Sequence, residues 1–273
     1  MSRDSQNNEC VFCDKPLKQW RAHFYQCPAC KNIFNAHYQK IVYEDNYFEG
    51  EYRKQYGKSY FDDKKNIQSK MRQRLQYLSQ YVPDFRNKTL LEIGSAAGYF
   101  LEIAEKEGMM ARGWEISKYM TEYANSCGNR TIQGDFFSLL KKSSEQYDVV
   151  GAFYVIEHFV SQKQVWQAFS KLIKDNGFLI LSIPYAFGPG LYFHMNEWIK
   201  NHPADHFIDY TRSGIKKICS MFGFKLMSIY PEGIHPERFP RGDIFFLKYF
   251  YSKIQTKCAF SDTVFLVFQK SNF

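Results

Sequence analysis

The sequence predicts an α/β domain built on a largely parallel sheet, preceded by a small module held by cysteines. Two observations carry this prediction: apolar strand-like runs alternate with helical patterns from residue 89 onward, and two close cysteine pairs lie within the first 30 residues. Of the 273 residues, 45% are hydrophobic and 23% charged, which excludes a disordered or fibrous chain. A chain of this length can bury a full core without disulfide bonds.

The first element is the cysteine module. Cys10 and Cys13 form one C-x-x-C pair, and Cys27 and Cys30 form a second pair, with 13 residues between the two pairs. Two such pairs supply four thiolates in the tetrahedral arrangement of a closed, structural zinc site. Clustered cysteines in an intracellular chain indicate metal ligands before disulfides. We therefore predict a zinc ribbon over residues 1–40, whose zinc has a structural and not a catalytic role.

An aromatic-rich linker, residues 41–87, follows the ribbon. Tyr52, Tyr56 and Tyr60 recur every four residues, so a helix would place them on one face. Such a stripe is either core packing or a lid of phenols over an active site. The apolar face of the next predicted helix is formed by Ile67, Met71, Leu75 and Leu78. Pro83 is expected to end this helix.

The main domain is expected over residues 88–273, with a long insert at about 231–262. Its predicted strands span residues 89–93, 110–114, 131–133, 147–153, 178–183, 224–230 and 263–269. Helical patterns separate them, including one from about 161 to 174 that is stopped by Asn176-Gly177 and another over 211–222. This alternation favours a parallel sheet. Ligands of such sheets bind outside the carboxyl ends of the strands.

Several acidic residues fall at these strand ends. Glu92 lies in the first strand of the domain, directly before the small-residue turn 94–98, where backbone N–H groups can approach a ligand. Glu115 ends the second strand, 21 residues after Gly94, and is placed to accept both hydroxyls of a ribose. Asp135 and Glu157 follow the next two strands. Together they indicate one ligand site.

The ordered motifs are residues 91–98 (LEIGSAAG), 113–117 (GWEIS), 134–136 (GDF) and 147–159, which runs from YDVV to IEHF. As a set they resemble the class I S-adenosylmethionine-dependent methyltransferases. The resemblance covers about residues 88–270. It is closest to the group that contains ubiquinone-biosynthesis O-methyltransferases and many sugar and natural-product methyltransferases, some of which also carry an N-terminal zinc module. It implies a seven-stranded Rossmann-like sheet with helices on both faces.

The resemblance assigns S-adenosylmethionine to these strand ends. The implied cofactor residues are Glu92, Gly94, Ala96, Gly98, Glu115, Ile116, Asp135, Phe136, Phe153 and Tyr154. Glu92 and the glycine turn would shape the pocket for the methionine moiety, and Glu115 would bind the ribose. Asp135 and Phe136 would hold the adenine. Ala96 departs from the family pattern, which usually has glycine there.

Phe153 and Tyr154 would border the sulfonium in the same scheme. A rival cofactor is NAD in a dehydrogenase fold, which also uses a glycine turn and an acid after the second strand. The turn here is E-x-G-x-x-x-G and not G-x-G-x-x-G. The Glu157-His158 pair after the fourth strand also favours methyl transfer.

Two histidines are candidates for a general base, which methyl transfer needs when the acceptor is a hydroxyl or a carbon acid. His158 follows the fourth strand, and His206 lies between the fifth strand and the next helix. Each could instead be a packing or hydrogen-bonding histidine. His202 and His206 have metal-ligand spacing, but Pro203 interrupts it and the sequence indicates no third ligand.

Two acceptor classes are disfavoured. Enzymes that methylate exocyclic base amines often carry Asn/Asp-Pro-Pro-aromatic after the fourth strand, where this chain has Ala-Phe-Tyr-Val at 152–155. Pyrimidine C5 methylation needs a cysteine nucleophile. Cys127, Cys219 and Cys258 do not lie at the strand ends that this chemistry uses.

The net charge of +8 is concentrated in the two ends of the chain. This suits an anionic partner such as RNA, a nucleotide-sugar or an acidic membrane surface, or simply a solvated basic face. No secretory signal or membrane-spanning run is visible, so we expect a cytoplasmic protein. The basic, aromatic stretch 244–251 could contact a membrane, grip a hydrophobic acceptor, mediate dimerisation or form a lid. The sequence does not indicate the oligomeric state.

Three functions remain open. The leading hypothesis is a methyltransferase for a small-molecule acceptor: a sugar, nucleotide-sugar or lipid-like metabolite. The second is an RNA methyltransferase whose ribbon and basic N-terminal part bind phosphates. The third is a catalytically degenerate domain that only binds the cofactor, which the intact set of motif residues disfavours.

Overall fold

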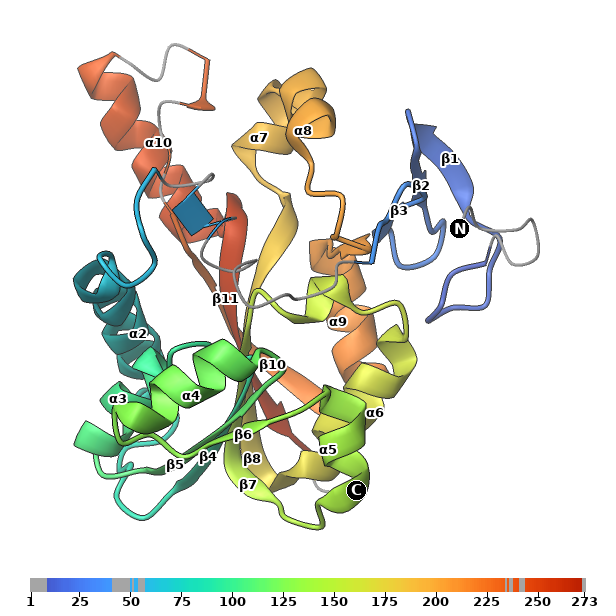
Figure 1. Cartoon of the computed structure of the whole chain (residues 1–273). Coiled ribbons are helices and arrows are strands. Elements are labelled where there is room, and N and C mark those ends of the chain that lie inside the picture. Colours follow the sequence, from blue (N-terminus) through green and yellow to red (C-terminus); the bar gives the residue numbers. More distant parts are fainter. Residues whose placement is uncertain are drawn as a thin grey trace. The chain divides into compact units, whose positions relative to one another are not determined.

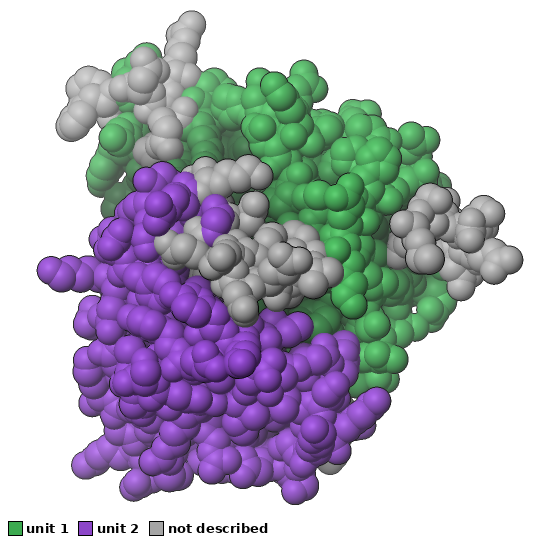
Figure 2. Space-filling view, viewed as in Figure 1, with its two compact units in different colours: residues 1–40, 154–170, 181–273 green, residues 41–153, 171–180 purple. Residues whose placement is uncertain are grey.

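The computed structural model describes residues 9–40, 50, 52–53, 57–233, 235, 238–240 and 244–271. The chain forms two compact units, shown in green and purple in Figure 2. Unit 1 contains residues Met1–Lys40, Tyr154–Ser170 and Leu181–Phe273, and unit 2 contains Ile41–Phe153 and Lys171–Ile180.

A seven-stranded sheet has the strand order β10-β11-β8-β7-β4-β5-β6 (Figure 1). Its strands are β4 (Thr89–Ile93), β5 (Met110–Glu115), β6 (Thr131–Gln133), β7 (Tyr147–Phe153), β8 (Ile173–Phe187), β10 (Phe224–Pro231) and β11 (Ser261–Lys270). β4 pairs in parallel with β5 and β7, and β5 with β6, whereas β10 and β11 are antiparallel. The predicted α/β fold with a seven-stranded sheet is confirmed.

Unit 2 contains the parallel strands β4 to β7. The described helices that accompany them include α2 (Lys64–Leu78), α3 (Tyr99–Lys106), α4 (Lys118–Ser126) and α5 (Phe136–Lys142). The apolar residues of β4 and β7 are buried, as expected for strands covered on both faces. Ile93 is paired with Trp114 on one side and Ala152 on the other. The carboxyl ends of these three strands therefore lie at one edge of the sheet.

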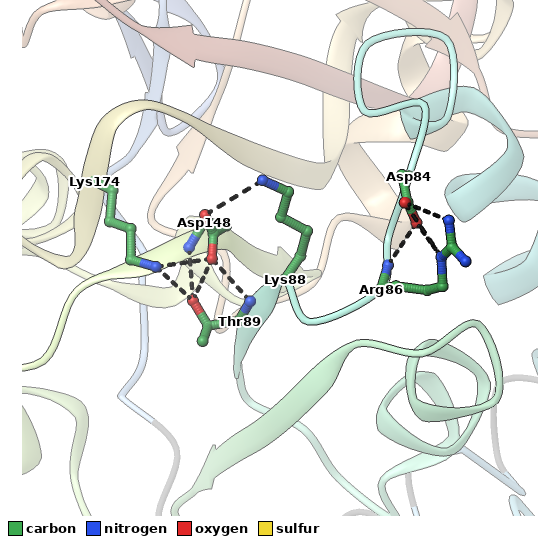
Figure 3. Close-up of polar contacts among 6 residues, drawn as sticks. All are labelled: Asp84, Arg86, Lys88, Thr89, Asp148 and Lys174. Carbon is green, nitrogen blue, oxygen red and sulfur yellow. Dashed lines mark hydrogen bonds and ion pairs between the residues drawn. The ribbon is translucent and has the colours of Figure 1, made fainter.

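A polar network joins the amino ends of β4, β7 and β8 (Figure 3). The backbone N–H and hydroxyl of Thr89 donate to the Asp148 carboxylate at 2.9 and 2.7 Å, and the Lys174 ammonium lies 2.8 Å from it. Burial opposes ionisation of Asp148, but the bonds from Lys174 and Thr89 outweigh it and lower its pKa to about 2. This edge is opposite to the one that carries the motif turns.

Unit 1 contains β10, β11 and most of the remaining helices. These are α6 (Gln162–Leu172), α7 (Pro189–Phe193), α8 (Met195–Asn201), α9 (Arg212–Met221) and α10 (Phe245–Cys258), with a short 3-10 turn at Ile156–His158. Trp166 is fully buried and its ring contacts Phe222, Phe224 and Phe268. These aromatic contacts form the core of the unit.

The cysteine module is part of unit 1. Its strands are β1 (Lys18–Arg21), β2 (Phe24–Gln26) and β3 (Ile33–Asn35), and its sheet is completed by β9 (Ile208–Asp209) in the order β1-β2-β3-β9. Phe24 and Ile33 are buried in one cluster with Ala186 and Leu191. The module therefore shares both a sheet and a core with the C-terminal part of the chain.

Some boundaries differ from those expected from sequence. The predicted helix 161–174 ends at Leu172, because β8 begins at Ile173 and runs through Asn176 and Gly177. Asn176 has φ +61°, and a Cβ on Gly177 would lie 2.9 Å from the carbonyl oxygen of Asp148. These two residues thus shape an irregularity in a strand and not a helix stop. Helix α2 ends at Leu78, five residues before the proline expected to end it.

Two further expectations concern exposed segments. No helix in the described parts of the chain is both long and apolar enough to cross a membrane. The stretch 244–251 forms the start of α10, where Tyr249 and Phe250 are 66% and 57% exposed. Tyr251 instead stacks on Phe239, with ring centroids 4.3 Å apart. Whether this stretch contacts a membrane stays a prediction.

Candidate functional site

The turn between β4 and α3 has an unusual backbone. Gly94, Ala96 and Gly98 all have positive φ, at +70°, +44° and +74°. Glycine adopts this left-handed region without strain, whereas an L-residue does so at a cost of about 1 kcal/mol. A Cβ on Gly98 would also lie 2.6 Å from the side-chain nitrogen of Asn129. The sequence-predicted turn is therefore confirmed as a tight loop, with Ala96 as its one strained side chain.

Glu115 fastens this turn to the end of β5. Its Oε2 accepts the backbone N–H of Ala96 and its Oε1 that of Ser117, both at 2.8 Å. Burial raises the pKa of Glu115, and the two N–H bonds partly oppose the shift. The next residue, Ile116, is 44% exposed. The carboxylate thus joins the motif turns of two neighbouring parallel strands.

Glu92 lies in β4, just before the turn, and is almost fully buried. Its Oε2 has no hydrogen-bond partner among the described residues, and the same is true of Ser95 Oγ. Burial raises the pKa of Glu92 well above its usual value, and the charge of Arg74 partly opposes this. Buried polar atoms are normally paired. These two oxygens are therefore positions where a ligand can supply the missing hydrogen bonds.

Asp135 and Phe136 begin α5 after β6. Asp135 Oδ1 accepts the backbone N–H of Ser138 at 3.1 Å and caps the helix. Phe136 is 6% exposed and packs against Trp114, with ring centroids 6.2 Å apart. The backbone of Gly134 donates to Glu115 at 2.8 Å. Both predicted adenine-site residues thus sit at the same edge of unit 2 as Glu115.

Phe153 ends β7 in unit 2. Its ring meets Phe100 edge-on at 4.9 Å, and the Arg74 guanidinium lies 4.3 Å from the ring centroid. Tyr154, the first residue of the next segment of unit 1, has φ +57° and is 41% exposed. Its hydroxyl donates to Glu232 at 3.1 Å. A strained, exposed tyrosine at a strand end is typical of a functional position.

The two candidate bases meet in unit 1. His158 Nδ1 lies 3.0 Å from the Asp205 carbonyl and 3.2 Å from its carboxylate. The rings of His158 and His206 cross at 77° with centroids 5.0 Å apart. Tyr38 from the cysteine module donates its hydroxyl to the His158 carbonyl at 3.0 Å. The structure thus brings together the two histidines that the sequence singled out, and adds Asp205 and Tyr38.

These histidines have opposite charge preferences. Burial tends to lower the pKa of His158, but its hydrogen bond to Asp205 and the charge of Glu157 raise it to about 9. Burial lowers the pKa of His206 to about 4, helped by the charge of His158. At neutral pH the site therefore holds an imidazolium paired with a carboxylate, beside a neutral imidazole.

Comparison with known families decides the identity of the fold. A family model described as a methyltransferase domain matches residues 64–229. The chain belongs to the methyltransferase domain family. It is a class I S-adenosylmethionine-dependent methyltransferase, as its motifs predicted. No curated protein matches the sequence.

Solved structures share the fold of this methyltransferase. A SAM-dependent methyltransferase from Archaeoglobus fulgidus has a TM-score of 0.58 at 17% identity, covering 82% of this chain and 100% of that chain. Magnesium protoporphyrin IX methyltransferase from Synechocystis, with bound SAH, has a TM-score of 0.58 at 15% identity, covering 83% and 98%. A putative methyltransferase from Haloferax volcanii, in a complex with the activator Trm112, has 0.57 at 14%, covering 85% and 100%.

Glu157 is a further buried polar group of unit 1. It is fully buried, and neither carboxylate oxygen has a hydrogen-bond partner in the described part of the chain. Burial raises its pKa to about 7, against the pull of His158. Ligand-type atoms of Glu157, His158 and His206 lie within 4.8 Å of one another, as do those of His202, His206 and Asp209. Asp209 thus supplies a third potential metal ligand beside His202 and His206, for which the sequence indicated no third ligand.

The four cysteines of the ribbon module also come together, with all four sulfurs within 4.8 Å. The two pairs have matching backbones. In the first, the N–H of Asp14 donates to the Cys10 carbonyl, and in the second that of Lys31 donates to Cys27, both at 2.9 Å. The residues after the pairs, Asp14 and Lys31, both have positive φ. The set therefore forms two equivalent knuckles.

Two residues of the cofactor edge were missed by sequence reasoning. Arg74 is 3% exposed and comes from the face of α2 that also carries Met71 and Leu78. A basic residue on an otherwise apolar helical face was the available signal. Tyr60 was considered only as a member of a helical stripe. It lies in a turn after Gly57 and stacks on Tyr99, with ring centroids 5.3 Å apart.

The tyrosine stripe itself is accounted for as packing. Tyr60 is buried in one cluster with Ala96 and Ala97 of the motif turn, and Tyr52 packs against that cluster. Tyr52 also donates its hydroxyl to Asp63 at 2.6 Å. Tyr56 lies outside the described residues. The described phenols therefore pack against the motif turn within unit 2.

Proposed function

We propose that this methyltransferase transfers the methyl group of S-adenosylmethionine to a hydroxyl or acidic carbon of a small metabolite. The observation that carries the proposal is the His158–Asp205 pair beside His206. A histidine held at Nδ1 by a carboxylate presents Nε2 for proton exchange with a ligand. Methylation of an amine or a thiolate would not need such a pair.

The cofactor residues fit S-adenosylmethionine. When bound, this cofactor supplies a methyl group that its sulfonium has already activated. We assign Glu92 and the turn 94–98 to the methionine moiety, because Glu92 Oε2 lacks a partner within the described residues. Glu115 is assigned to the ribose, and Asp135 with Phe136 to the adenine. Each lies at the carboxyl edge of the parallel strands of unit 2.

The protein's own part in the reaction is proton transfer and alignment. Neutral His158 would take the acceptor proton, and Asp205 would hold the ring and stabilise the imidazolium that results. Alignment of the acceptor with the methyl group supplies much of the remaining rate enhancement. Asp205 acts through His158 and is a positioning residue.

We also propose that the ribbon cysteines bind a structural zinc ion. Zinc–sulfur bonds of about 2.3 Å in a tetrahedron place the sulfurs about 3.8 Å apart. Cys10 and Cys30 sulfurs are 3.7 Å apart. Backbone N–H groups of Ala29 and Cys30 point to Cys27 Sγ at 3.3 and 3.4 Å, which would stabilise a thiolate there. Four protein ligands leave no open position, so the zinc would be structural.

The ribbon's contacts favour a small-molecule acceptor over RNA. Asn35 donates to the His206 carbonyl at 3.1 Å, and Asn32 accepts the Thr211 N–H at 2.9 Å. The ribbon thus holds the segment that carries His206 and Asp205. Such a role as a support explains its presence without an RNA partner.

The test incubates purified protein with methyl-labelled S-adenosylmethionine and host extract, with and without ribonuclease. We expect label in a small, ribonuclease-insensitive fraction.

Glu115→Gln should weaken S-adenosylhomocysteine binding at least tenfold, about 1.4 kcal/mol. Glu145→Gln is the matched control, because Glu145 binds Arg112 on the exposed surface. Label in large RNA that disappears after ribonuclease would refute the small-molecule acceptor, and absence of cofactor binding would favour a degenerate domain.

A further inference from the structure

A cavity lies within unit 1, where the ribbon meets β8, α7 and α9. Its volume is about 640 Å³, within the range of about 300–1,000 Å³ that is usual for small-molecule sites. The ribbon provides one wall through Trp20 and Lys31, and the start of α9 provides another through Arg212 and Lys216. None of the cofactor or base residues assigned above lines it. The cavity is therefore separate from the residues assigned to the cofactor and to proton transfer.

Aromatic rings form the apolar side of the cavity. Trp20, Phe187 and Tyr192 line it, and the rings of Phe187 and Tyr192 are perpendicular with centroids 5.8 Å apart. Trp20 is held edge-on by Trp198 at 6.3 Å. Tyr192 is 57% exposed, so its ring is available to a ligand. Flat aromatic rings of this kind are platforms on which a nucleobase stacks.

Cations form the polar side. Lys31, Arg212 and Lys216 line the cavity, and its lining contains no acidic residue. Arg212 donates to the Cys258 carbonyl at 3.3 Å, a neutral acceptor that leaves its charge uncompensated by that contact. Thr211 and Ser213 add hydroxyls beside these cations. Three positive charges without an acidic neighbour in the lining suit an anionic ligand with more than one negative charge.

We propose that this cavity binds a nucleoside diphosphate, with the base against Trp20 and Tyr192 and the diphosphate against Lys31, Arg212 and Lys216. An apolar aromatic half and a cationic half match the two halves of that ligand. Within the proposed function, on which this step rests, the ligand is the carrier part of a nucleotide-linked sugar acceptor. The ribbon then has a binding role besides its support of the histidine segment.

The direct test is calorimetric titration with uridine, adenosine, guanosine, cytidine and thymidine diphosphates, without cofactor. We expect at least one diphosphate to bind. Its free nucleoside and inorganic pyrophosphate should each bind at least about tenfold more weakly, because each engages only half of the cavity. Equal binding of either half, or no binding of any diphosphate at 1 mM (about the weak limit for a specific site), would overturn the proposal.

Variants locate the binding. Lys31→Gln combined with Lys216→Gln should weaken diphosphate binding at least about tenfold, and Tyr192→Ala about fivefold. The matched control is Lys217→Gln, whose lysine is the next residue of α9 but does not line the cavity. All variants should keep the wild-type Tm and affinity for S-adenosylhomocysteine. Wild-type diphosphate affinity in the double variant would overturn the assignment.

The outcomes separate this inference from the proposed function. Diphosphate binding without methyl transfer to any nucleotide-sugar would retain the cavity and remove the proposed acceptor. Labelled metabolite in the extract experiment, together with no diphosphate binding, would retain methyl transfer and remove the cavity ligand. Tighter binding of a short oligoribonucleotide than of any diphosphate, lost in the double variant, would overturn the inference in favour of RNA.

Discussion

At the scale of single residues, the two candidate bases show how burial and neighbouring charges shift the pKa of histidine in opposite directions. His158 and His206 are neighbours, yet only His158 has a carboxylate at hydrogen-bond distance from its ring. Burial lowers the pKa of both rings, to about 4 for His206, but the hydrogen bond to Asp205 and the charge of Glu157 raise the pKa of His158 to about 9. Catalysis by His158 and catalysis by His206 would therefore give different pH profiles for the same reaction.

If His158 is the base, its neutral form is the active one. Below its pKa of about 9 that form increases tenfold per pH unit, so kcat should rise between pH 6 and 9. His158→Gln should lower kcat by about 10²–10⁴-fold with unchanged cofactor affinity. Asp205→Asn should move the rise to lower pH, because it removes the charge that raises the pKa.

The control for this prediction is His194→Gln, since His194 is exposed and its Nε2 lies 2.8 Å from the Arg238 carbonyl, away from His158 and His206 in the chain. Steady-state rates at constant ionic strength across pH 5–10 (about the range in which either base would titrate) provide the measurement. A profile that is flat above pH 5 (about one unit above the lower pKa) would instead assign the base to His206, whose pKa is about 4.

At the scale of elements, the strand ends have divided roles. The carboxyl ends of β4, β5 and β6 carry the motif turns, and the buried carboxylates of Glu92 in β4 and Glu115 in β5 have raised pKa values. The amino ends carry the network around Asp148, whose pKa is lowered to about 2 (Figure 3). Burial thus disfavours the charged carboxylate at the ligand edge, whereas hydrogen bonds stabilise it at the other edge, where it joins β4, β7 and β8.

Asp148→Asn should therefore reduce stability without affecting cofactor binding. Loss of the charge-assisted bonds to Thr89 and Lys174 should cost about 2 kcal/mol in the free energy of unfolding at pH 7. The native carboxyl has the lower pKa, so its contribution is present above pH 4 and is lost as the pH falls toward about 2. The difference between variant and wild type should shrink across that window.

Urea unfolding at several pH values measures this. Asp84→Asn is the matched control, because Asp84 also pairs with a basic side chain, Arg86, but on the exposed surface (Figure 3). It should leave the unfolding free energy nearly unchanged. An equal loss of unfolding free energy in both variants would show that the half-buried network around Asp148 contributes no more than an exposed ion pair.

The elements were largely predictable because their signals are local. Apolar runs gave β4 to β7 to within a residue or two, and the motif turn was recognisable from its small residues. Asn176-Gly177 led to a wrong helix end in the prediction, because a helix stop and an irregularity in a strand can have the same local composition. Arg74, Asp205 and Asp209 were missed because their roles depend on partners distant in the sequence, which no periodicity reports.

At the scale of the whole molecule, the ribbon is the least separable part. Its strand β3 pairs with β9, and Lys163 of α6 forms an ion pair with Asp14 at 2.8 Å. Cys30, one of the proposed zinc ligands, accepts hydrogen bonds at its carbonyl from Thr211 and Ser213. Metal binding by the ribbon should therefore stabilise all of unit 1.

Removal of the proposed zinc tests this directly. Stripping with a chelator, or Cys13→Ser, should lower the Tm of the protein by about 10 °C, as expected for a loss of about 3 kcal/mol in a chain of this size. Cys127→Ser is the control, because Cys127 is exposed and outside the cluster. Calorimetry with parallel zinc analysis provides the measurement. An unchanged main transition would mean that the ribbon unfolds by itself, and a zinc-free native protein would refute the metal site.

The pairing of β3 with β9 also constrains how this architecture can be inherited. A Cβ on Gly214 would lie 1.7 Å from Asn32 Oδ1, so any larger residue at one position requires a change at the other. A chimera that exchanges only residues 1–40 between relatives would break this match. The exchangeable unit therefore includes, besides the ribbon, at least the segment from 204 to 214, two pieces of sequence that must be passed on together.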